Sequence, residues 1–265
     1  MIIDGRAIAK EILDELAGKV AGATRPPRLT IITCAPNFET QKYLTLKQRK
    51  ASEVGIETNV IELATSSTTS EVTQAITTAA GESDGVVVQL PLPAQIDTDA
   101  VLAAIPFSHD VDAIHYDGSG EVLPPVVGAI AEIANRCGVS FNEKRVTIVG
   151  AGRLVGAPAA LWAVDKGAYI TIVTKETDET DVAAAIATAD IIISGAGAPH
   201  LLTPKNIKTG VALFDAGTSE DDGNLVGDAD PACADKASIF TPVPGGIGPI
   251  TIAVLFKNLL ILQRQ

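Results

Sequence analysis

The apolar residues of this chain alternate between helical and strand spacing in two separate runs, and this repetition limits the folds open to it. One run covers residues 7–90, and the second begins at Arg145. Alternation of this kind is typical of α/β domains built on parallel sheets. Residues 116–125 are rich in Gly, Asp, Ser and Pro and separate the two runs. We therefore predict two α/β domains, since 265 residues are enough to form two cores.

The expected elements follow from the spacing. In the first run the expected helices span 7–21, 38–54 and 68–80, and the expected strands span 28–34, 56–62 and 85–90. In the second run the expected helices span 126–137, 154–166 and 179–188, and the expected strands span 145–149, 169–173, 190–194 and 211–215. Helical spacing over 249–265 predicts a last helix that packs back on the first domain. The predicted division is 1–118, completed by 243–265, and 119–242 for a Rossmann-like, doubly wound parallel sheet.

The acidic composition argues against two classes of partner. The formal net charge is −12 at pH 7, which repels nucleic acid and anionic membranes. The first six residues already include charges, so neither a secretory leader nor a membrane anchor is expected. Cys34, Cys137 and Cys233 are too far apart in sequence for a disulfide framework or a zinc site, and no metal is expected. We predict a cytoplasmic protein.

The segment Val146–Gly156 has the context of a dinucleotide-binding turn. A strand pattern runs into Gly150, Gly152 and Gly156, and a helix pattern follows. Glycines at such a turn allow a pyrophosphate to approach closely, and the helix N-terminus favours its negative charge. The last glycine comes one residue later than in the usual motif. A structural turn without a ligand is therefore the alternative interpretation.

A polar stripe is predicted on the helix 38–54. Thr40, Tyr43 and Lys47 share one face, because offsets of three and seven residues return to the same side of a helix. Taken alone, such a stripe is more often solvated surface, since lysine is seldom buried without a partner. Gln89 favours the other interpretation, because it lies at the carboxyl end of a predicted buried strand, where open α/β sheets bind ligands.

Two further segments carry polar or rigid features. Asp110-Val-Asp112 follows the next helix along the chain after Gln89 and supplies a carboxylate. The loop 241–251, Thr-Pro-Val-Pro-Gly-Gly-Ile-Gly-Pro-Ile-Thr, is stiff and uncharged, which indicates a backbone shaped against something flat or crowded. The alternative is a plain connection to the last helix.

Taken together, these segments resemble the bifunctional methylenetetrahydrofolate dehydrogenase/cyclohydrolase family. The similarity extends over nearly the whole chain and rests on Tyr43-x-x-x-Lys47, Gln89-Leu-Pro-Leu-Pro93, Asp110-Val-Asp112, the glycine turn up to Pro158 and the loop 241–251. It implies a folate-binding catalytic domain and a dinucleotide-binding domain. It implies oxidation of 5,10-methylenetetrahydrofolate to 5,10-methenyltetrahydrofolate with NADP, or possible use of NAD, and hydrolysis of that product to 10-formyltetrahydrofolate. It also implies a homodimer, the commonest oligomeric state.

The resemblance implies a role for each matching residue. Lys47 is the expected central catalytic residue, with Gln89 holding it, Tyr43 beside the pterin and Asp112 hydrogen-bonded to the pterin's polar edge. The expected substrate contacts are Thr40, Pro91, Pro244, Gly245 and Gly246. The expected cofactor contacts are Gly150, Ala151, Gly152, Arg153, Val155, Gly156, Thr174, Lys175 and Thr218.

Departures from the family pattern leave alternatives open. Ala113 stands where the family usually has glycine, and Leu123–Gly128 replaces its Pro-Cys-Thr-Pro-x-Gly segment. Thr174–Thr177 replaces the usual His-Ser-Arg/Lys-Thr, so that Lys175 is available for a 2′-phosphate and Glu176 for a free 2′-hydroxyl. The alternatives are an enzyme that retains only one of the two activities and a non-catalytic nucleotide-binding homologue.

Overall fold

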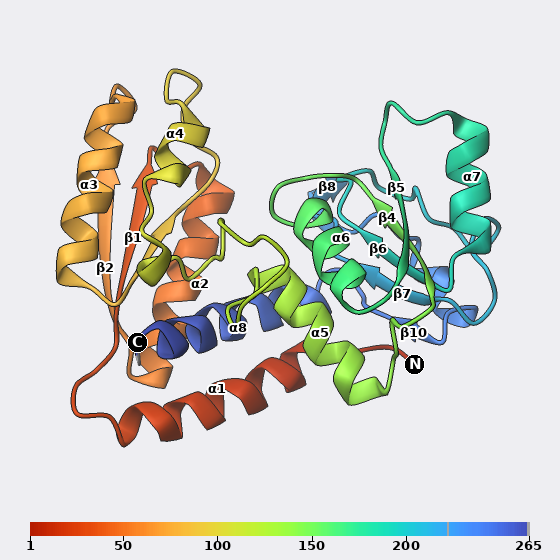
Figure 1. The fold of residues 1–265 in the computed structure, drawn as a ribbon, viewed down its shortest axis with the longest axis horizontal. Coiled ribbons are helices and arrows are strands. Elements are labelled where there is room, and N and C mark those ends of the chain that lie inside the picture. The colour runs from red at the N-terminus through yellow and green to blue at the C-terminus, as the bar shows by residue number, and fades with distance from the viewer. Residues whose placement is uncertain (222, 264–265) are drawn as a thin grey trace. The chain divides into compact units, whose positions relative to one another are not determined.

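The protein folds into two compact units in a computed structural model that describes residues 1–221 and 223–263, with residues 38 and 39 described by their backbone alone. The three-stranded unit comprises Lys10–His115, Glu121–Leu123 and the residues from Ile252 on. The five-stranded unit comprises Met1–Ala9, Tyr116–Gly120 and Pro124–Thr251. Both units contain a parallel sheet with helices beside it, as the alternating patterns predict (Figure 1).

The three-stranded unit has a parallel sheet of order β2-β1-β3. Its elements are β1 (Arg28–Cys34), α2 (Phe38–Val54), β2 (Glu57–Leu63), α3 (Thr69–Glu82), β3 (Gly85–Val88), α4 (Thr98–Ala103), the 3₁₀ turn η1 (Phe107–His109), most of α1 (Gly5–Ala21) and the end of α8 (Ile247–Leu262). The helices α2 and α3 start at side-chain caps, because Asn37 accepts from the Thr40 N–H and Thr68 forms a capping box with Glu71.

Both faces of this sheet are covered, which is why all of β1 after Arg28 is buried. The helices α3 and α4 lie on one face and pack on Ile32 and Val86. Helix α8 packs on the opposite face, where a Cβ added to Gly85 would touch Leu259. The long apolar helix at the C-terminus thus packs on the first sheet, as predicted.

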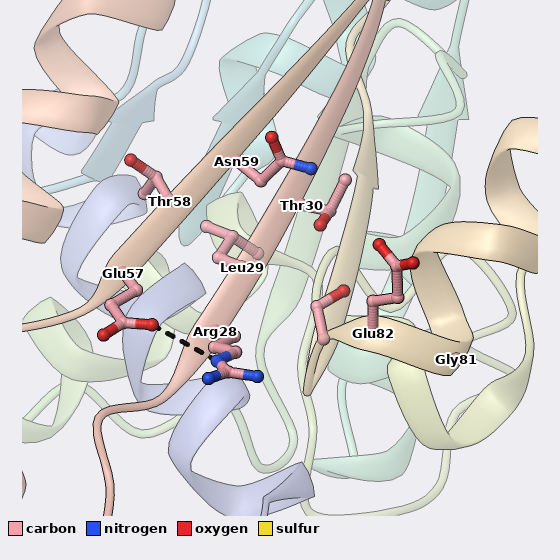
Figure 2. A pocket seen from close by; sticks show the side chains of 9 residues that line it. Arg28, Leu29, Thr30, Glu57, Thr58, Asn59, Gly81 and Glu82 are labelled. Carbon is pink, nitrogen blue, oxygen red and sulfur yellow. Dashed lines mark hydrogen bonds and ion pairs between the residues drawn. The ribbon is translucent and has the colours of Figure 1, made fainter.

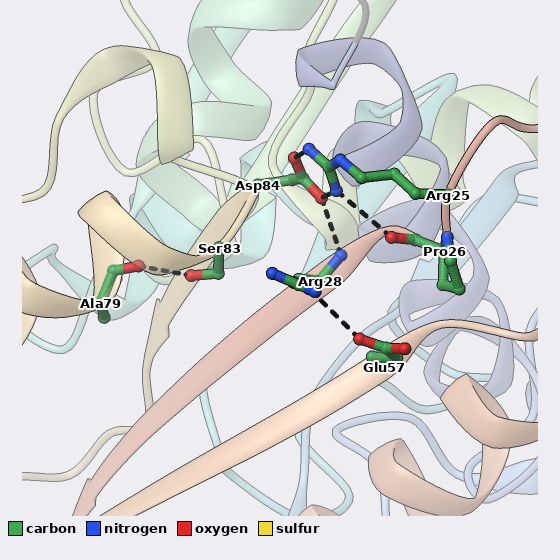
Figure 3. Close-up of polar contacts among 7 residues, drawn as sticks. All are labelled: Arg25, Pro26, Arg28, Glu57, Ala79, Ser83 and Asp84. Carbon is green, nitrogen blue, oxygen red and sulfur yellow. Dashed lines mark hydrogen bonds and ion pairs between the residues drawn. The ribbon is translucent and has the colours of Figure 1, made fainter.

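A charged cluster ties the strand starts of this unit together (Figure 3). The Arg25 guanidinium donates to both carboxylate oxygens of Asp84, at 2.7 and 2.5 Å. The same carboxylate accepts from the backbone N–H of Arg28 at 2.8 Å. Because Arg28 begins β1 and Asp84 precedes β3, the cluster fixes the register of two neighbouring strands.

The five-stranded unit has a parallel sheet of order β10-β7-β6-β4-β5. Its elements are α5 (Pro125–Cys137), β4 (Arg145–Val149), α6 (Gly156–Asp165), β5 (Tyr169–Val173), α7 (Glu179–Thr188), β6 (Ile191–Ser194), β7 (Ala212–Asp215), the hairpin β8 (Ser219–Asp221) and β9 (Asn224–Val226), the 3₁₀ turn η2 (Pro231–Asp235) and β10 (Ile239–Phe240). Helices α5 and α6 lie on one face and α7 on the other, so the prediction of a doubly wound sheet is confirmed (Figure 1).

Aromatic packing joins α6 to this sheet. The rings of Phe141 and Trp162 meet edge to face with centroids 4.7 Å apart, and Phe214 of β7 lies 6.3 Å from Phe141. The first residues of the chain extend the sheet beyond β10, because Ile3 N–H donates to Phe240 O at 2.9 Å.

Some expected boundaries differ from the observed ones. The strand expected over 85–90 ends at Val88, and the helix expected from 154 starts at Gly156. The last helix starts at Ile247 and ends at Leu262, whereas residues 264–265 of the expected helix lie outside the described residues. The patterns also missed the short strands β8, β9 and β10, which have too few residues to show an alternation.

Candidate active site

The strand order of the three-stranded unit creates a ligand-binding position beside Gln89. The chain crosses from β1 to β2 on one side and then to β3 on the other, so the loops after β1 and β3 diverge. Gln89 follows β3, and its N–H still donates to Ile32 O at 2.8 Å. The sheet therefore fixes the backbone from which the Gln89 side chain extends.

Lys47 reaches this position from α2. Its side chain is buried, with 6% of the residue exposed, and its Nζ donates to Gln89 Oε1 at 3.0 Å. The Gln89 Nε2 donates to Leu90 O at 3.0 Å, which turns the amide so that its oxygen meets the lysine. The ring of Tyr43, one helical turn before Lys47, has its centroid 4.9 Å from Nζ. The polar stripe is thus directed inward rather than toward solvent at Lys47.

Burial displaces the acid–base equilibria of this cluster. Burial lowers the pKa of Lys47, and the negative charge of Asp112 opposes this only in part. The pKa of Asp112 is raised to about 6, because burial and the charge of Asp110 outweigh the effect of Lys47. Each group therefore has an acid–base equilibrium displaced toward its neutral form, as is common where side chains exchange protons with a ligand.

The turn that carries Asp112 is held from two directions. Asp110 is buried, and its Oδ2 accepts from the His115 N–H at 3.0 Å. Asn258 of α8 is also buried and donates through Nδ2 to Val111 O at 2.9 Å and to Leu123 O at 2.8 Å. Ala113 follows with φ 49°, a left-handed conformation that glycine adopts more easily. The turn is therefore retained although alanine replaces the family's glycine.

The expected substrate contacts divide between the two units. Thr40 is half-buried in the first turn of α2, and Pro91 is exposed just after Gln89, both in the unit of Lys47. Pro244, Gly245 and Gly246 belong to the five-stranded unit. The three-stranded unit thus contains Tyr43, Lys47, Gln89 and Asp112, whereas residues 241–251 belong to the five-stranded unit.

The expected loop 241–251 is a loop only up to Gly246, because α8 begins at Ile247, and this loop is closely packed against the start of α1. Gly5 N–H donates to Gly245 O at 2.9 Å, and a Cβ added to Gly5 would collide with Gly246 O. Gly245 itself has φ 114°, and Gly246 N–H donates to Pro242 O at 2.7 Å. The two glycines are therefore required by the backbone path, in agreement with a loop shaped at close quarters.

The expected dinucleotide turn lies at the switch point of the five-stranded sheet, where the chain leaves β4 and later returns as β6. Gly150 has φ 90°, and a Cβ on Gly156 would collide with Gly150 O. Among the described residues, no atom lies within 4 Å of a Cβ placed on Gly152, and no side chain of that part of the chain caps the N-terminus of α6. The open space beside Gly152 and the positive end of the α6 helix dipole fit a pyrophosphate at this turn.

The remaining expected cofactor contacts surround this turn. Ala151 and Arg153 are exposed, Val155 is half-buried, and Thr218 is exposed after β7. At the end of β5, the Thr174 hydroxyl donates to Glu176 Oε2 at 2.6 Å, and Lys175 Nζ lies 3.8 Å from Glu176 Oε1. The loop after β5 thus presents a cation and an anion side by side.

A pocket of about 560 Å³ lies elsewhere in the three-stranded unit (Figure 2). Its lining includes Arg28 and Glu57, the first residues of β1 and β2, together with Glu82 at the end of α3. It therefore opens at the amino ends of the parallel strands, whereas Gln89 lies at their carboxyl ends. It contains none of the expected site residues.

Among the described residues, no helix is both long and apolar enough to cross a membrane.

Comparison with protein families matches both parts of the chain. Residues 3–112 match the tetrahydrofolate dehydrogenase/cyclohydrolase catalytic domain, and residues 124–265 match the NAD(P)-binding domain of the same family.

Similar proteins share this assignment. The bifunctional protein FolD of Halothermothrix orenii is 36% identical over 272 residues, which cover 97% of this chain and 95% of the relative. FolD of Aquifex aeolicus is 34% identical over 275 residues, covering 98% and 94%.

Solved structures agree at the level of the whole fold. The bifunctional FolD dehydrogenase/cyclohydrolase of Campylobacter jejuni superimposes with a TM-score of 0.95 at 30% identity, over 100% of this chain and 98% of the other. The corresponding Trypanosoma brucei enzyme, complexed with NADP cofactor and an inhibitor, gives 0.91 at 33% identity, over 100% and 97%.

Proposed function

Because the chain belongs to the tetrahydrofolate dehydrogenase/cyclohydrolase family, we propose that the Lys47–Gln89 pair is the centre of its chemistry. The protein is a bifunctional folate enzyme that oxidises 5,10-methylenetetrahydrofolate with NADP and hydrolyses the 5,10-methenyltetrahydrofolate product to 10-formyltetrahydrofolate. The observation that carries the assignment of residues is a buried lysine whose Nζ donates to Gln89 Oε1 at 3.0 Å.

In the hydrolytic step, Lys47 acts as the base. A water attacks the methenyl carbon and gives a proton to Lys47 as the new C–O bond forms. The bond between this carbon and N5 then breaks, N5 takes up a proton, and the formyl group stays on N10. Burial lowers the pKa of Lys47, so a larger fraction of its amine is free to accept the proton of the water. Gln89 fixes the direction of Lys47 Nζ and adds no charge. A carboxylate at the same position would add a negative charge.

In the oxidative step, the chain's role is to orient the substrate. NADP supplies a hydride acceptor when it is bound. Tyr43 offers a ring face beside Lys47 for the pterin, and Asp112 offers a carboxyl group for the pterin's polar edge. Alignment of two planar groups is the main requirement of hydride transfer, so positioning supplies most of the catalysis.

We assign cofactor binding to the switch point of the five-stranded unit. Gly150 and Gly156 give the tight turn, and the uncapped N-terminus of α6 suits the pyrophosphate. Lys175 is the candidate partner for the 2′-phosphate. Glu176 lies beside it and opposes that charge, so it should limit the preference for NADP over NAD.

Lys47→Met tests the assignment of the base, because methionine keeps the length of the side chain but exchanges no proton. We expect hydrolysis of preformed methenyltetrahydrofolate at saturation to fall about a hundredfold or more. Lys50→Met is the matched control, since Lys50 lies on the same helix but pairs with Glu53 near the surface. Turnover of Lys47→Met within a few fold of the wild type would overturn the role.

Absorbance at the methenyl-folate band separates the two activities of the wild type. Mixing the protein with methylenetetrahydrofolate and NADP should give a transient rise followed by decay. A lasting rise would mean that only the dehydrogenase is active, and no change would mean a non-catalytic homologue.

Cofactor preference has its own test. Glu176→Gln removes a negative charge next to Lys175 and should raise kcat/KM for NADP relative to NAD by about fivefold. Glu179→Gln, an exposed change in the first turn of α7, is the control. A ratio that does not change would contradict the role of Glu176.

We also propose a homodimer that covers the edge strand β5. Tyr169 and Ile172 on this strand are 65% and 46% exposed, and Val164 on neighbouring α6 is 59% exposed. An open strand edge with apolar side chains is an unusual surface for a monomer, and a second copy would bury it. Light scattering should give about twice 27.3 kDa. Ile172→Lys should return the mass to that of one chain, and an unchanged dimer would place the interface elsewhere.

A cytoplasmic location is part of the same proposal. The three cysteines are free thiols, which is typical of proteins from reducing compartments. Cell fractionation that recovers the protein outside the cytoplasm would contradict it.

A further inference from the structure

Asp228 is a fully buried carboxylate at the carboxyl end of the five-stranded sheet. Its exposure is 0%, and it follows the hairpin β8–β9. Oδ2 accepts from the Ser194 hydroxyl at 2.6 Å and from the Ala196 N–H at 2.8 Å, and Oδ1 accepts from the Ala198 N–H at 2.7 Å. One side chain thus fastens the end of β6 and the loop that follows it.

Asp215, the last residue of β7, forms a second anchor beside the first. It is 1% exposed, and its carboxylate accepts from the N–H groups of Gly217 at 2.9 Å, Asp228 at 3.2 Å and Ala229 at 2.8 Å. The two carboxylates are therefore coupled through the backbone of Asp228. Together they hold the loops after β6 and β7.

The packing around both carboxylates leaves no spare room. A Cβ added to Gly217 would collide with the Asp228 carboxylate, and one added to Gly227 would collide with Asp215. Gly150 of the dinucleotide turn also lies close to the loop after β6, because a Cβ there would lie 2.9 Å from Gly195 O. The loop after β6 is thus packed against the turn assigned to the cofactor pyrophosphate.

Both carboxylates depend on uncharged hydrogen-bond donors. In the described residues, the hydrogen bonds to these two carboxylates come from N–H and hydroxyl groups, and no lysine or arginine pairs with them. Burial, together with the charge of Asp228, raises the pKa of Asp215 to about 6. Buried charge of one sign is unfavourable unless fixed dipoles offset it. A role in positioning the loops after β6 and β7 would explain why two buried carboxylates are present here.

We propose that Asp228 is a positioning residue for the dehydrogenase reaction, acting through the Ser194–Ala198 segment and, by way of Asp215, through the Gly217–Thr218 loop. Both segments lie at the switch-point end of the sheet, where the cofactor's nicotinamide half would be held. The inference rests on the proposed function, because it assigns these loops to the cofactor. The hydrolytic step uses Lys47 and Gln89, so it should depend little on Asp228.

The two activities of the enzyme provide the test. Asp228→Asn turns an amide toward backbone N–H donors and cannot accept all three hydrogen bonds. We expect the dehydrogenase kcat/KM to fall about tenfold or more, with a higher KM for NADP. Hydrolysis of preformed methenyltetrahydrofolate should stay within twofold of the wild type. Ser194→Ala, which removes one donor and leaves the carboxylate, should give a smaller fall in the same direction.

Thr147→Val is the matched control. Thr147 is 2% exposed in the adjacent strand β4, and its hydroxyl donates to Ala185 O at 2.9 Å, so its loss weakens the same sheet without touching the loops. The ratio of the two activities should be unchanged in this variant. Equal falls in both activities, or an unchanged ratio in Asp228→Asn, would overturn the proposal. If Asp228→Asn does not fold, the ratio of the two activities in Ser194→Ala provides the test. A wild-type enzyme without dehydrogenase activity would instead contradict the proposed function.

Discussion

Asn258 in the last helix donates its side-chain amide to the carbonyl of Val111, a residue 147 positions earlier and directly before Asp112. The same Nδ2 donates to Leu123 O. Asn258 therefore joins α8 to a residue just before Ala113 and to the first residue of the Leu123–Gly128 segment, both of which depart from the family pattern. The position of Asp112 depends on a helix far away in sequence.

Asn258→Leu should weaken folate binding. Leucine has similar bulk but no donor, so the buried carbonyl of Val111 and the partly buried carbonyl of Leu123 lose their partner, at about 1–3 kcal/mol for a buried group. We expect a lower Tm and a KM for the folate substrate raised about tenfold in both activities, because 1.4 kcal/mol corresponds to a tenfold change. Asn206→Leu is the control, since Asn206 makes similar bonds to Leu201 and Thr203 in the other unit. An unchanged folate KM in Asn258→Leu would contradict this prediction.

Gln89→Glu should move the pH dependence of hydrolysis upward. A carboxylate next to Lys47 stabilises the ammonium and raises its pKa, whereas the neutral amide does not. Activity requires the free amine and rises with pH through the pKa of Lys47, so the rising limb should shift by about one unit or more. The measurement is kcat for hydrolysis against pH. Gln95→Glu, an exposed change that leaves Lys47 alone, should keep the wild-type profile.

Position 113 should accept glycine but not a branched side chain. Ala113 has φ 49°, where alanine is strained by about 1–2 kcal/mol. Ala113→Gly relieves this strain but loses a buried methyl group, worth about 0.8 kcal/mol, and adds backbone entropy to the unfolded chain. The terms nearly cancel, so the free energy of unfolding should stay near that of the wild type. Ala113→Val should lower the free energy of unfolding by about 2 kcal/mol or more. If urea denaturation gives the two variants the same free energy of unfolding, a left-handed conformation at position 113 is excluded.

Asp84→Asn should lower the free energy of unfolding at neutral pH and change it little in acid. Burial alone would raise the pKa of Asp84, but hydrogen bonds from Arg25 and Arg28 outweigh it and lower the pKa below 3.8 (Figure 3). A carboxyl whose pKa is lower in the folded state contributes stability above its unfolded pKa and loses it as pH falls through the folded pKa. We expect a loss of about 2 kcal/mol at pH 7, and curves that converge below pH 3.8. Asp14→Asn, which breaks an exposed pair with Lys10, should change little.

Local signals explain why most of the fold could be predicted from the sequence. The expected bounds 38–54 agree with helix α2, which Gly55 ends with φ 89°. The strands 28–34, 145–149 and 169–173 were also placed at their observed bounds, since apolar runs bordered by turn residues mark them. The hairpin β8–β9 carries no such pattern, because its residues are mostly exposed and polar.

The site could be predicted only in part. Helical spacing places Tyr43 and Lys47 on one face, and the family resemblance pairs Lys47 with Gln89. Neither signal reaches Asn258, because a polar residue in an apolar helix does not reveal which distant carbonyl it bonds. The coupling of Asp215 to Asp228 was missed for the same reason. Long-range hydrogen bonds depend on the folded topology and leave no local periodicity.

The unit that holds Lys47 draws its residues from both ends of the sequence, since it combines Lys10–His115 with the residues from Ile252 on. A ribosome makes the five-stranded sheet between these two parts, and domains generally fold in the order of their synthesis. The bonds from Asn258 can therefore form only after the residues of the five-stranded sheet have been made. The turn that carries Asp112 is synthesised early but becomes fastened only when the final helix has emerged.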